Sequence, residues 1–135
     1  MKTLHTTRVT TTGGKNGHVE SEDGILDLDL AKSGSKATNP EELFAAAYSA
    51  SFARALEEVA ENSEFDLEDM KVTAEVSLSK NEDEELQLSV VLDVYLPDTD
   101  VDAGEEIINE AYENCPFSLA LEDNVDVTLN LLIDD

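Results

Sequence analysis

Several kinds of residue that mark particular protein classes are scarce in this sequence. It has one cysteine, Cys115, so no disulfide can form within a chain, which excludes a disulfide-stabilised secreted scaffold. Only 8 Lys and Arg oppose 32 Asp and Glu, and the formal net charge is -24. Nucleic acids and anionic membrane surfaces would repel such a chain, so neither is an expected partner.

Long apolar runs are missing as well. No stretch approaches the roughly 20 apolar residues that cross a bilayer, and residues 1–12 lack the apolar core of a secretion signal. We therefore expect a cytoplasmic protein. The two histidines, His5 and His18, have no cysteine or second histidine at metal-ligand spacing, so the sequence predicts no metal site and no other cofactor. Ser49 and Ser51 lack the nucleophile elbow of serine hydrolases.

What remains is a globular composition with a strongly acidic character. Hydrophobic residues make up 41% of the 135 positions, and Trp is absent, so the core should be mostly aliphatic. Because no repeat or linker interrupts the chain, residues 1–135 are expected to form a single domain. The acidic excess indicates adaptation to high salt, steering of a cationic partner, or a solvated surface that keeps the protein soluble.

Hydrophobic periodicity predicts an α+β fold. The expected order is strands at 4–12, 18–21 and 25–30, a helix at 39–62, strands at 70–79 and 86–96, a helix from 101 or 102 to 114, a helical turn at 117–121, and a strand at 125–133. Alternation places the following side chains on inward faces of the strands: Leu26, Leu28, Leu30, Val72, Ala74, Val76, Leu78, Leu86, Leu88, Val90, Leu92, Val94, Val125, Val127, Leu129 and Leu131. The first three strands should form an antiparallel meander through a glycine turn at 13–17 and a second turn at Asp23-Gly24.

The helix expected at 39–62 has clear local signals. Asn39 can cap it, Pro40 suits the first helical position, and Glu41 favours the positive end of the helix dipole. Residues 43–53 are apolar or small nearly all round the helix. This pattern predicts a helix that is buried on most sides.

Five segments, in order along the chain, resemble the OsmC/Ohr family of organic hydroperoxide resistance proteins, and the Ohr branch in particular. They are residues 13–17, 19–24, 38–46, 115–118 and 124–129, although the loop at 31–38 is shorter than is typical of that branch. The resemblance implies an intertwined homodimer with antiparallel sheets packed around buried central helices. It also implies reduction of organic hydroperoxides in oxidative stress by a peroxidatic cysteine, a resolving cysteine, and a dithiol reductant such as a lipoylated protein.

The catalytic positions of the family carry over unevenly. The resemblance places Glu41 at the glutamate that activates the thiolate, and Cys115 at the resolving cysteine. Lys15 stands where the family has an arginine, and Ser51 stands where it has the peroxidatic cysteine. Four aromatic residues could line a pocket for an apolar peroxide or another apolar small molecule, although core filling would account for at least two of them: Phe44, Tyr48, Phe52 and Phe117.

Serine at position 51 alters the expected chemistry. Peroxide reduction needs a thiolate that becomes a sulfenic acid, whereas a hydroxyl does not ionise near neutral pH and has no such oxidised state. Three interpretations stay open: an active peroxidase whose reactive cysteine was changed to Ser51, a relative without peroxidase activity that binds an apolar ligand, or a peroxidase that uses Cys115 alone. Structural roles also fit, with Cys115 as a buried hydrophobe, Glu41 as a dipole acid, Lys15 as a solvated turn residue, and Ser51 as a small residue at a helix contact.

Overall fold

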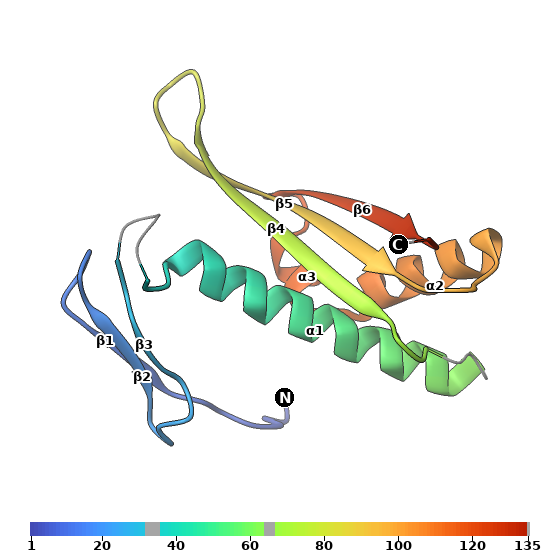
Figure 1. The fold of residues 1–135 in the computed structure, drawn as a ribbon, viewed down its shortest axis with the longest axis horizontal. Coiled ribbons are helices and arrows are strands. Elements are labelled where there is room, and N and C mark those ends of the chain that lie inside the picture. Colours follow the sequence, from blue (N-terminus) through green and yellow to red (C-terminus); the bar gives the residue numbers. More distant parts are fainter. Residues whose placement is uncertain (32–35, 64–66, 135) are drawn as a thin grey trace. The chain divides into compact units, whose positions relative to one another are not determined.

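The computed structural model describes residues 1–31, 36–63 and 67–134, so part of the loop expected at 31–38 lies outside the described residues. Along the chain the elements are β1 (Val9–Thr12), β2 (His18–Ser21), β3 (Asp27–Asp29), α1 (Pro40–Ser63), β4 (Lys71–Lys80), β5 (Leu86–Tyr95), α2 (Val101–Asn114), α3 (Pro116–Leu121) and β6 (Asp126–Leu132) (Figure 1). The chain forms two compact units, Met1–Leu43 and Phe44–Asp135, and each is described by itself.

The first unit contains a three-stranded antiparallel meander in the order β1-β2-β3, as predicted. Two of its strands are shorter than expected. β1 begins at Val9 rather than at residue 4, because β2 has only four residues to pair with it. β3 covers only Asp27–Asp29, because the turn after β2 takes up the residues between the two strands. Leu28, which was expected to be buried, is 39% exposed.

Charged side chains crowd one face of this sheet. The strand register pairs His18 with Asp29 and Glu20 with Asp27, which places all four side chains on the same side. The pKa of His18 is raised, first by its hydrogen bond with Asp29 and then by the nearby Asp27 carboxylate. In the turn that follows β2, hydrogen bonds from the Ser21 hydroxyl and the Ile25 N–H lower the pKa of Asp23.

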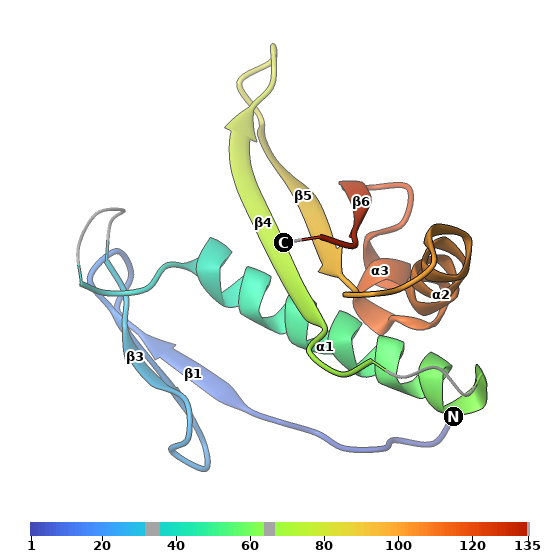
Figure 2. The same cartoon turned by 45° about the vertical axis from the view of Figure 1, so that its right-hand side comes forward.

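The second unit packs three helices against one face of a sheet. The sheet has the order β4-β5-β6, with β4 antiparallel to β5 and β6 parallel to β5 (Figures 1 and 2). The helices α2 and α3 form the connection that parallel pairing requires. The core lies between α1, α2 and the inward face of β5, and these side chains form it: Tyr48, Phe52, Ala55, Leu56, Val59, Val90, Leu92, Val94, Leu96, Ile107, Ile108, Ala111 and Cys115.

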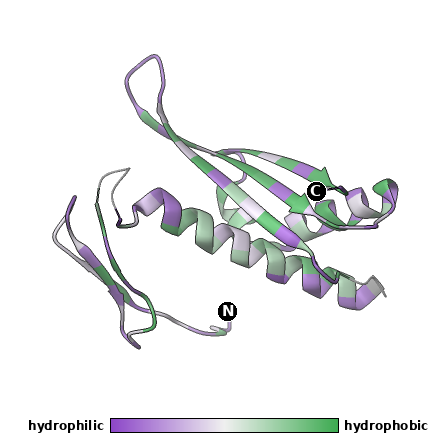
Figure 3. Cartoon of the chain, in the orientation of Figure 1, coloured by the Kyte–Doolittle hydropathy of each residue, from purple (hydrophilic) through white to green (hydrophobic). Residues whose placement is uncertain are grey.

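The predicted alternation holds along most of the sheet but fails at one end. Leu78 and Leu86 were expected to point into the core, and they are 48% and 67% exposed. Both lie near the end of the β4–β5 hairpin, which extends past the helices, and Figure 3 shows hydrophilic residues at its tip. Periodicity therefore predicted the face correctly, although nothing covers that face at the tip of the hairpin within the described residues.

The helix α1 is less buried than its sequence indicates. Its first half was expected to be covered on most sides, but Ala46, Ala47 and Ala50 are exposed. The reason is that α1 uses one face for the core, through Tyr48 and Phe52, and no element of the described part of the Phe44–Asp135 unit covers the opposite face. Among the described residues, no helix is long and apolar enough to cross a membrane.

Candidate active site

The site centres on Ser51 and Cys115, which are 64 residues apart in sequence. Ser51 lies in α1, and Cys115 is the extended residue between α2 and α3, with φ -83° and ψ 118°. Pro116 occupies the start of α3 and cannot continue the helix before it, so the chain turns at Cys115. This turn brings the Sγ of Cys115 to 3.6 Å from the Oγ of Ser51. Cys115 is fully buried, and Ser51 is half-buried.

A second polar contact supports the same region from inside the core. The hydroxyl groups of Tyr48 and Ser118 lie 2.7 Å apart, and both side chains are fully buried. Burial raises the pKa of Tyr48 to about 12, and the hydrogen bond with Ser118 partly offsets this effect. Ser118 was not among the predicted site residues, although a buried tyrosine hydroxyl needs a hydrogen-bond partner, and this need was the signal in the sequence.

The four aromatic residues divide into core and border positions. Phe52 and Tyr48 have no exposed surface and fill the core. The ring centroids of Phe44 and Tyr48 lie 6.3 Å apart, with the two rings edge-on. The ring centroids of Phe117 and Tyr48 lie 6.1 Å apart, with an angle of 31° between the ring planes. Phe44 is half-buried and Phe117 is 36% exposed, so these two rings form the accessible apolar border of the aromatic group. Helical spacing places Phe44, Tyr48 and Ser51 on one side of α1.

The remaining two predicted site residues belong to the first unit. Lys15 is exposed in the glycine turn, and among the described residues its side chain forms no hydrogen bond or ion pair. Glu41 is half-buried in the first turn of α1, where Asn39 caps the helix by accepting a hydrogen bond from the Glu42 N–H. Ser51 is ten positions after Glu41 in this helix, which is roughly 15 Å along the axis.

The geometry limits the reactions open to the Ser51–Cys115 pair. A hydroxyl and a thiol at this separation can share a hydrogen bond but cannot form a disulfide. A thiol at position 51 would be within reach of Cys115 after a rotation of its side chain, because the two residues already lie side by side. The site is therefore built around one cysteine and one serine where redox chemistry would use two cysteines.

The fold and the site define an α+β protein with a buried thiol beside its central helix. Residues 33–130 match the family described as OsmC-like protein. The chain is 43% identical to the organic hydroperoxide resistance protein OhrB of Bacillus subtilis, a match that covers 95% of this chain and 98% of that protein. It is 41% identical to OhrA of the same organism, over 95% of this chain and 96% of that protein.

The solved structures agree with these sequence matches. The crystal structure of an organic hydroperoxide resistance protein OsmC from Legionella pneumophila superposes with a TM-score of 0.92 at 41% identity, covering 98% of this chain and 100% of that chain. The chain belongs to the OsmC/Ohr family. The predicted family and the predicted α+β class are confirmed, with the difference that the second sheet contains a parallel pair, β5–β6.

Proposed function

We propose that this protein is an organic hydroperoxide resistance relative whose thiol peroxidase reaction is absent as the chain stands, because Ser51 occupies the position of the reacting cysteine. The observation that carries the proposal is the 3.6 Å between the Oγ of Ser51 and the Sγ of Cys115. A residue at position 51 reaches the one thiol of the chain, as the members of a disulfide-forming pair must. The names of OhrB and OhrA supply the substrate class, organic hydroperoxides.

The missing step is a matter of chemistry. A cysteine thiolate attacks an oxygen of the hydroperoxide, the alcohol leaves, and the sulfur becomes a sulfenic acid. A neighbouring thiol then displaces water from the sulfenic acid to form a disulfide, which an external dithiol such as a lipoylated protein reduces. The hydroxyl of Ser51 can take neither step. Cys115 acting alone is the weaker alternative, since its side chain is fully buried.

Binding of an apolar molecule does not depend on the missing thiol. Phe44 and Phe117 offer accessible aromatic surface beside the buried Tyr48 ring. A second candidate function, favoured by this border, is a non-enzymatic stress protein that binds a hydroperoxide or another apolar small molecule. An active peroxidase whose reactive cysteine was replaced by Ser51 would keep the same border.

We assign Lys15 and Glu41 to a site completed by two copies of the chain. Glu41 is nearly three helical turns from Ser51 within one α1, so it cannot touch Ser51 along that helix. Lysine would supply a positive charge there but lacks the guanidinium fork that bonds two acceptors at once. The exposed alanines of α1 support a homodimer, because a second chain would cover them. A reducing, cytoplasmic location suits the single free thiol.

Restoring one sulfur atom tests the proposal. The protein as it stands should consume cumene hydroperoxide with a dithiol no faster than buffer does. Ser51→Cys should consume it at least tenfold faster and form a disulfide with Cys115, detected by non-reducing mass spectrometry. Ser49→Cys is the matched control, because it adds a thiol to the same helix on the opposite side.

The controls separate the alternatives. Equal turnover by the unchanged protein and Ser51→Cys would show that position 51 is not the reacting position. Turnover by the unchanged protein that disappears in Cys115→Ser would establish the one-cysteine mechanism instead. If Ser51→Cys forms the disulfide but turns over slowly, adding Lys15→Arg should raise the rate, because the fork then replaces the point charge.

A further inference from the structure

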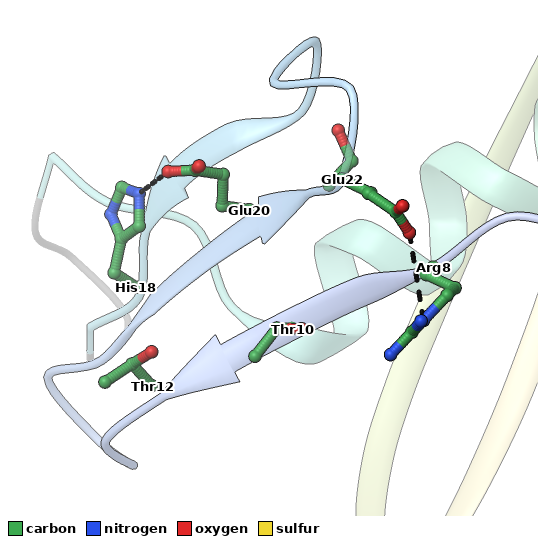
Figure 4. A pocket seen from close by; sticks show the side chains of 7 residues that line it. Arg8, Thr10, Thr12, His18, Glu20 and Glu22 are labelled. Carbon is green, nitrogen blue, oxygen red and sulfur yellow. Dashed lines mark ion pairs between the residues drawn. The ribbon is translucent and has the colours of Figure 1, made fainter.

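The first unit carries a group of side chains that the peroxide site does not use. His18 and Glu20 project from β2, and Asp27 projects from the neighbouring strand β3. The Nε2 atom of His18 lies 2.6 Å from an oxygen of Asp27 and 3.7 Å from an oxygen of Glu20. The possible ligand atoms of these three residues all lie within 4.8 Å of one another. Figure 4 shows His18 and Glu20 turned toward each other on one face of the sheet.

A fourth residue fixes the direction of the imidazole ring. The Nδ1 atom of His18 lies 2.8 Å from the Oδ1 of Asp29, so the Nδ1–H can donate to that carboxylate. At 2.6 Å from Asp27, Nε2–H donates to that carboxylate, and a divalent cation would take the place of this proton between the ring and the two carboxylates. A carboxylate behind a histidine, with the other ring nitrogen left for the ion, is the arrangement in which proteins hold metal-binding histidines. An imidazole held in this way distinguishes the group from a simple accumulation of surface acids.

We propose that His18, Glu20 and Asp27 bind a zinc-like divalent cation, with Asp29 as the positioning residue behind the imidazole. One imidazole and two carboxylates are suitable ligands for zinc, which takes three protein ligands and a water at an open site. Magnesium and calcium prefer oxygen ligands alone, so the imidazole selects against them.

The surroundings of the three ligands suit a cation that enters from solvent. The side chains of His18, Glu20 and Asp27 are 40%, 56% and 56% exposed, which leaves room for the ion and its water. On the same face, Thr10 and Thr12 lie opposite Glu20 and His18 and carry no charge. Arg8 lies further along the face, 3.8 Å from Glu22, and its charge is engaged there. The carboxylates of Glu20, Asp27 and Asp29 thus surround the imidazole with negative charge.

A bound ion would join two short strands. Two of the ligands lie on β2, and the third lies on β3, which has only three residues. Cross-strand ligation would add a link to the few hydrogen bonds that this pair can form. The proposal is independent of the peroxide chemistry, because none of its residues is among those assigned to that site, which are Ser51, Cys115, Lys15 and Glu41.

Zinc titration of the full chain, first stripped with a chelator, tests the site. Calorimetry near neutral pH should give one zinc per chain, and a millimolar excess of magnesium should not displace it. His18→Gln should weaken binding at least tenfold, whereas His5→Gln, which removes the other histidine, should leave it unchanged. Asp29→Asn should weaken binding by roughly 10-fold without changing the stoichiometry, as expected for a group behind the ligand.

A spectroscopic measurement on the unaltered protein keeps the test independent of variant folding. Long-range ¹H–¹⁵N spectra of the imidazole rings should show a zinc-dependent shift at Nε2 of His18 and none at His5. Equal zinc affinity in the unaltered protein and His18→Gln would overturn the proposal, because the acidic surface alone would then explain the binding. An unchanged His18 spectrum at saturating zinc would overturn it as well.

Discussion

At the scale of single residues, Tyr48 and Ser118 show how much one buried hydrogen bond matters. Neither side chain has exposed surface, and each hydroxyl is the other's partner at 2.7 Å. Ser118→Ala leaves the Tyr48 hydroxyl buried without a partner, so the free energy of unfolding should fall by about 1–3 kcal/mol. Urea denaturation measures this change.

Two further variants distinguish the lost hydrogen bond from lost packing. Ser118→Ala combined with Tyr48→Phe removes both hydroxyls and should recover much of the stability lost by Ser118→Ala alone. Ser49→Ala serves as the control, because the hydroxyl of that serine donates to the Ala46 carbonyl within its own helix. If the double variant is less stable than Ser118→Ala, the hydrogen bond is not the source of the effect.

At the scale of elements, the glycine turn between β1 and β2 depends on one of its three glycines more than on the others. A Cβ atom on Gly17 would lie 2.5 Å from the Thr12 carbonyl oxygen and 3.0 Å from that of Gly14. Both contacts are with backbone, so the turn itself would have to move. Gly17→Ala should therefore lower the stability of the β1–β2 pair by roughly 1–3 kcal/mol, measured by amide hydrogen exchange.

Gly14 provides a matched control for this prediction. A Cβ on Gly14 meets nothing within 4 Å, and its backbone is not left-handed. Gly14→Ala should leave hydrogen exchange unchanged or slow it slightly, because alanine restricts the unfolded chain. Equal acceleration in both variants would mean that the turn responds to any added methyl group.

The elements themselves could be predicted from the sequence, but the extent of their burial could not. Alternation predicted the inward faces of β5 and β6, since a strand repeats every second residue. It could not predict that Leu86 extends past the covering helices, because periodicity carries no information about where a neighbouring element ends. The exposed Ala46 and Ala50 of α1 reflect the same limit, since an apolar stretch does not show which of its sides a neighbouring element covers.

The candidate sites were predictable to different degrees. The pairing of Ser51 with Cys115 spans 64 residues, and only the family resemblance indicated it, because no local pattern relates the two positions. The acidic neighbours of His18 are nearer in sequence. Once the turn at Asp23-Gly24 is placed, the register that pairs Glu20 with Asp27 follows from the alternation of strands. The spacing of cysteine and histidine in the sequence indicated no metal site, because such spacing contains no information about carboxylates that meet across two strands.

At the scale of the whole molecule, the net charge of -24 should make folding and association depend on salt. Salt shortens the range of repulsion from about 10 Å at 0.1 M to about 3 Å at 1 M. Raising potassium chloride across this range should raise the melting temperature and shift the mass measured by light scattering from 14.7 kDa toward twice that value.

A variant with fewer charges tests the cause of the salt effect. Glu57, Glu58 and Glu61 are exposed on the second half of α1. Changing all three to Gln should raise the melting temperature at low salt and flatten its dependence on salt, because part of the repulsion is gone. An unchanged salt dependence in this variant would assign the effect to general exclusion of salt from the protein surface.

The parallel pairing of β6 with β5 also has a consequence for the chain as it is being made. β4 and β5 can pair soon after leaving the ribosome, but β6 is translated after α2 and α3, and its Asn130 bonds Asp93 from 37 residues away. Until β6 arrives, the nascent sheet keeps an open edge along β5 with unpaired N–H and C=O groups. In this interval the unfinished chain is most open to wrong pairing, and a chaperone that binds extended segments would act on it there.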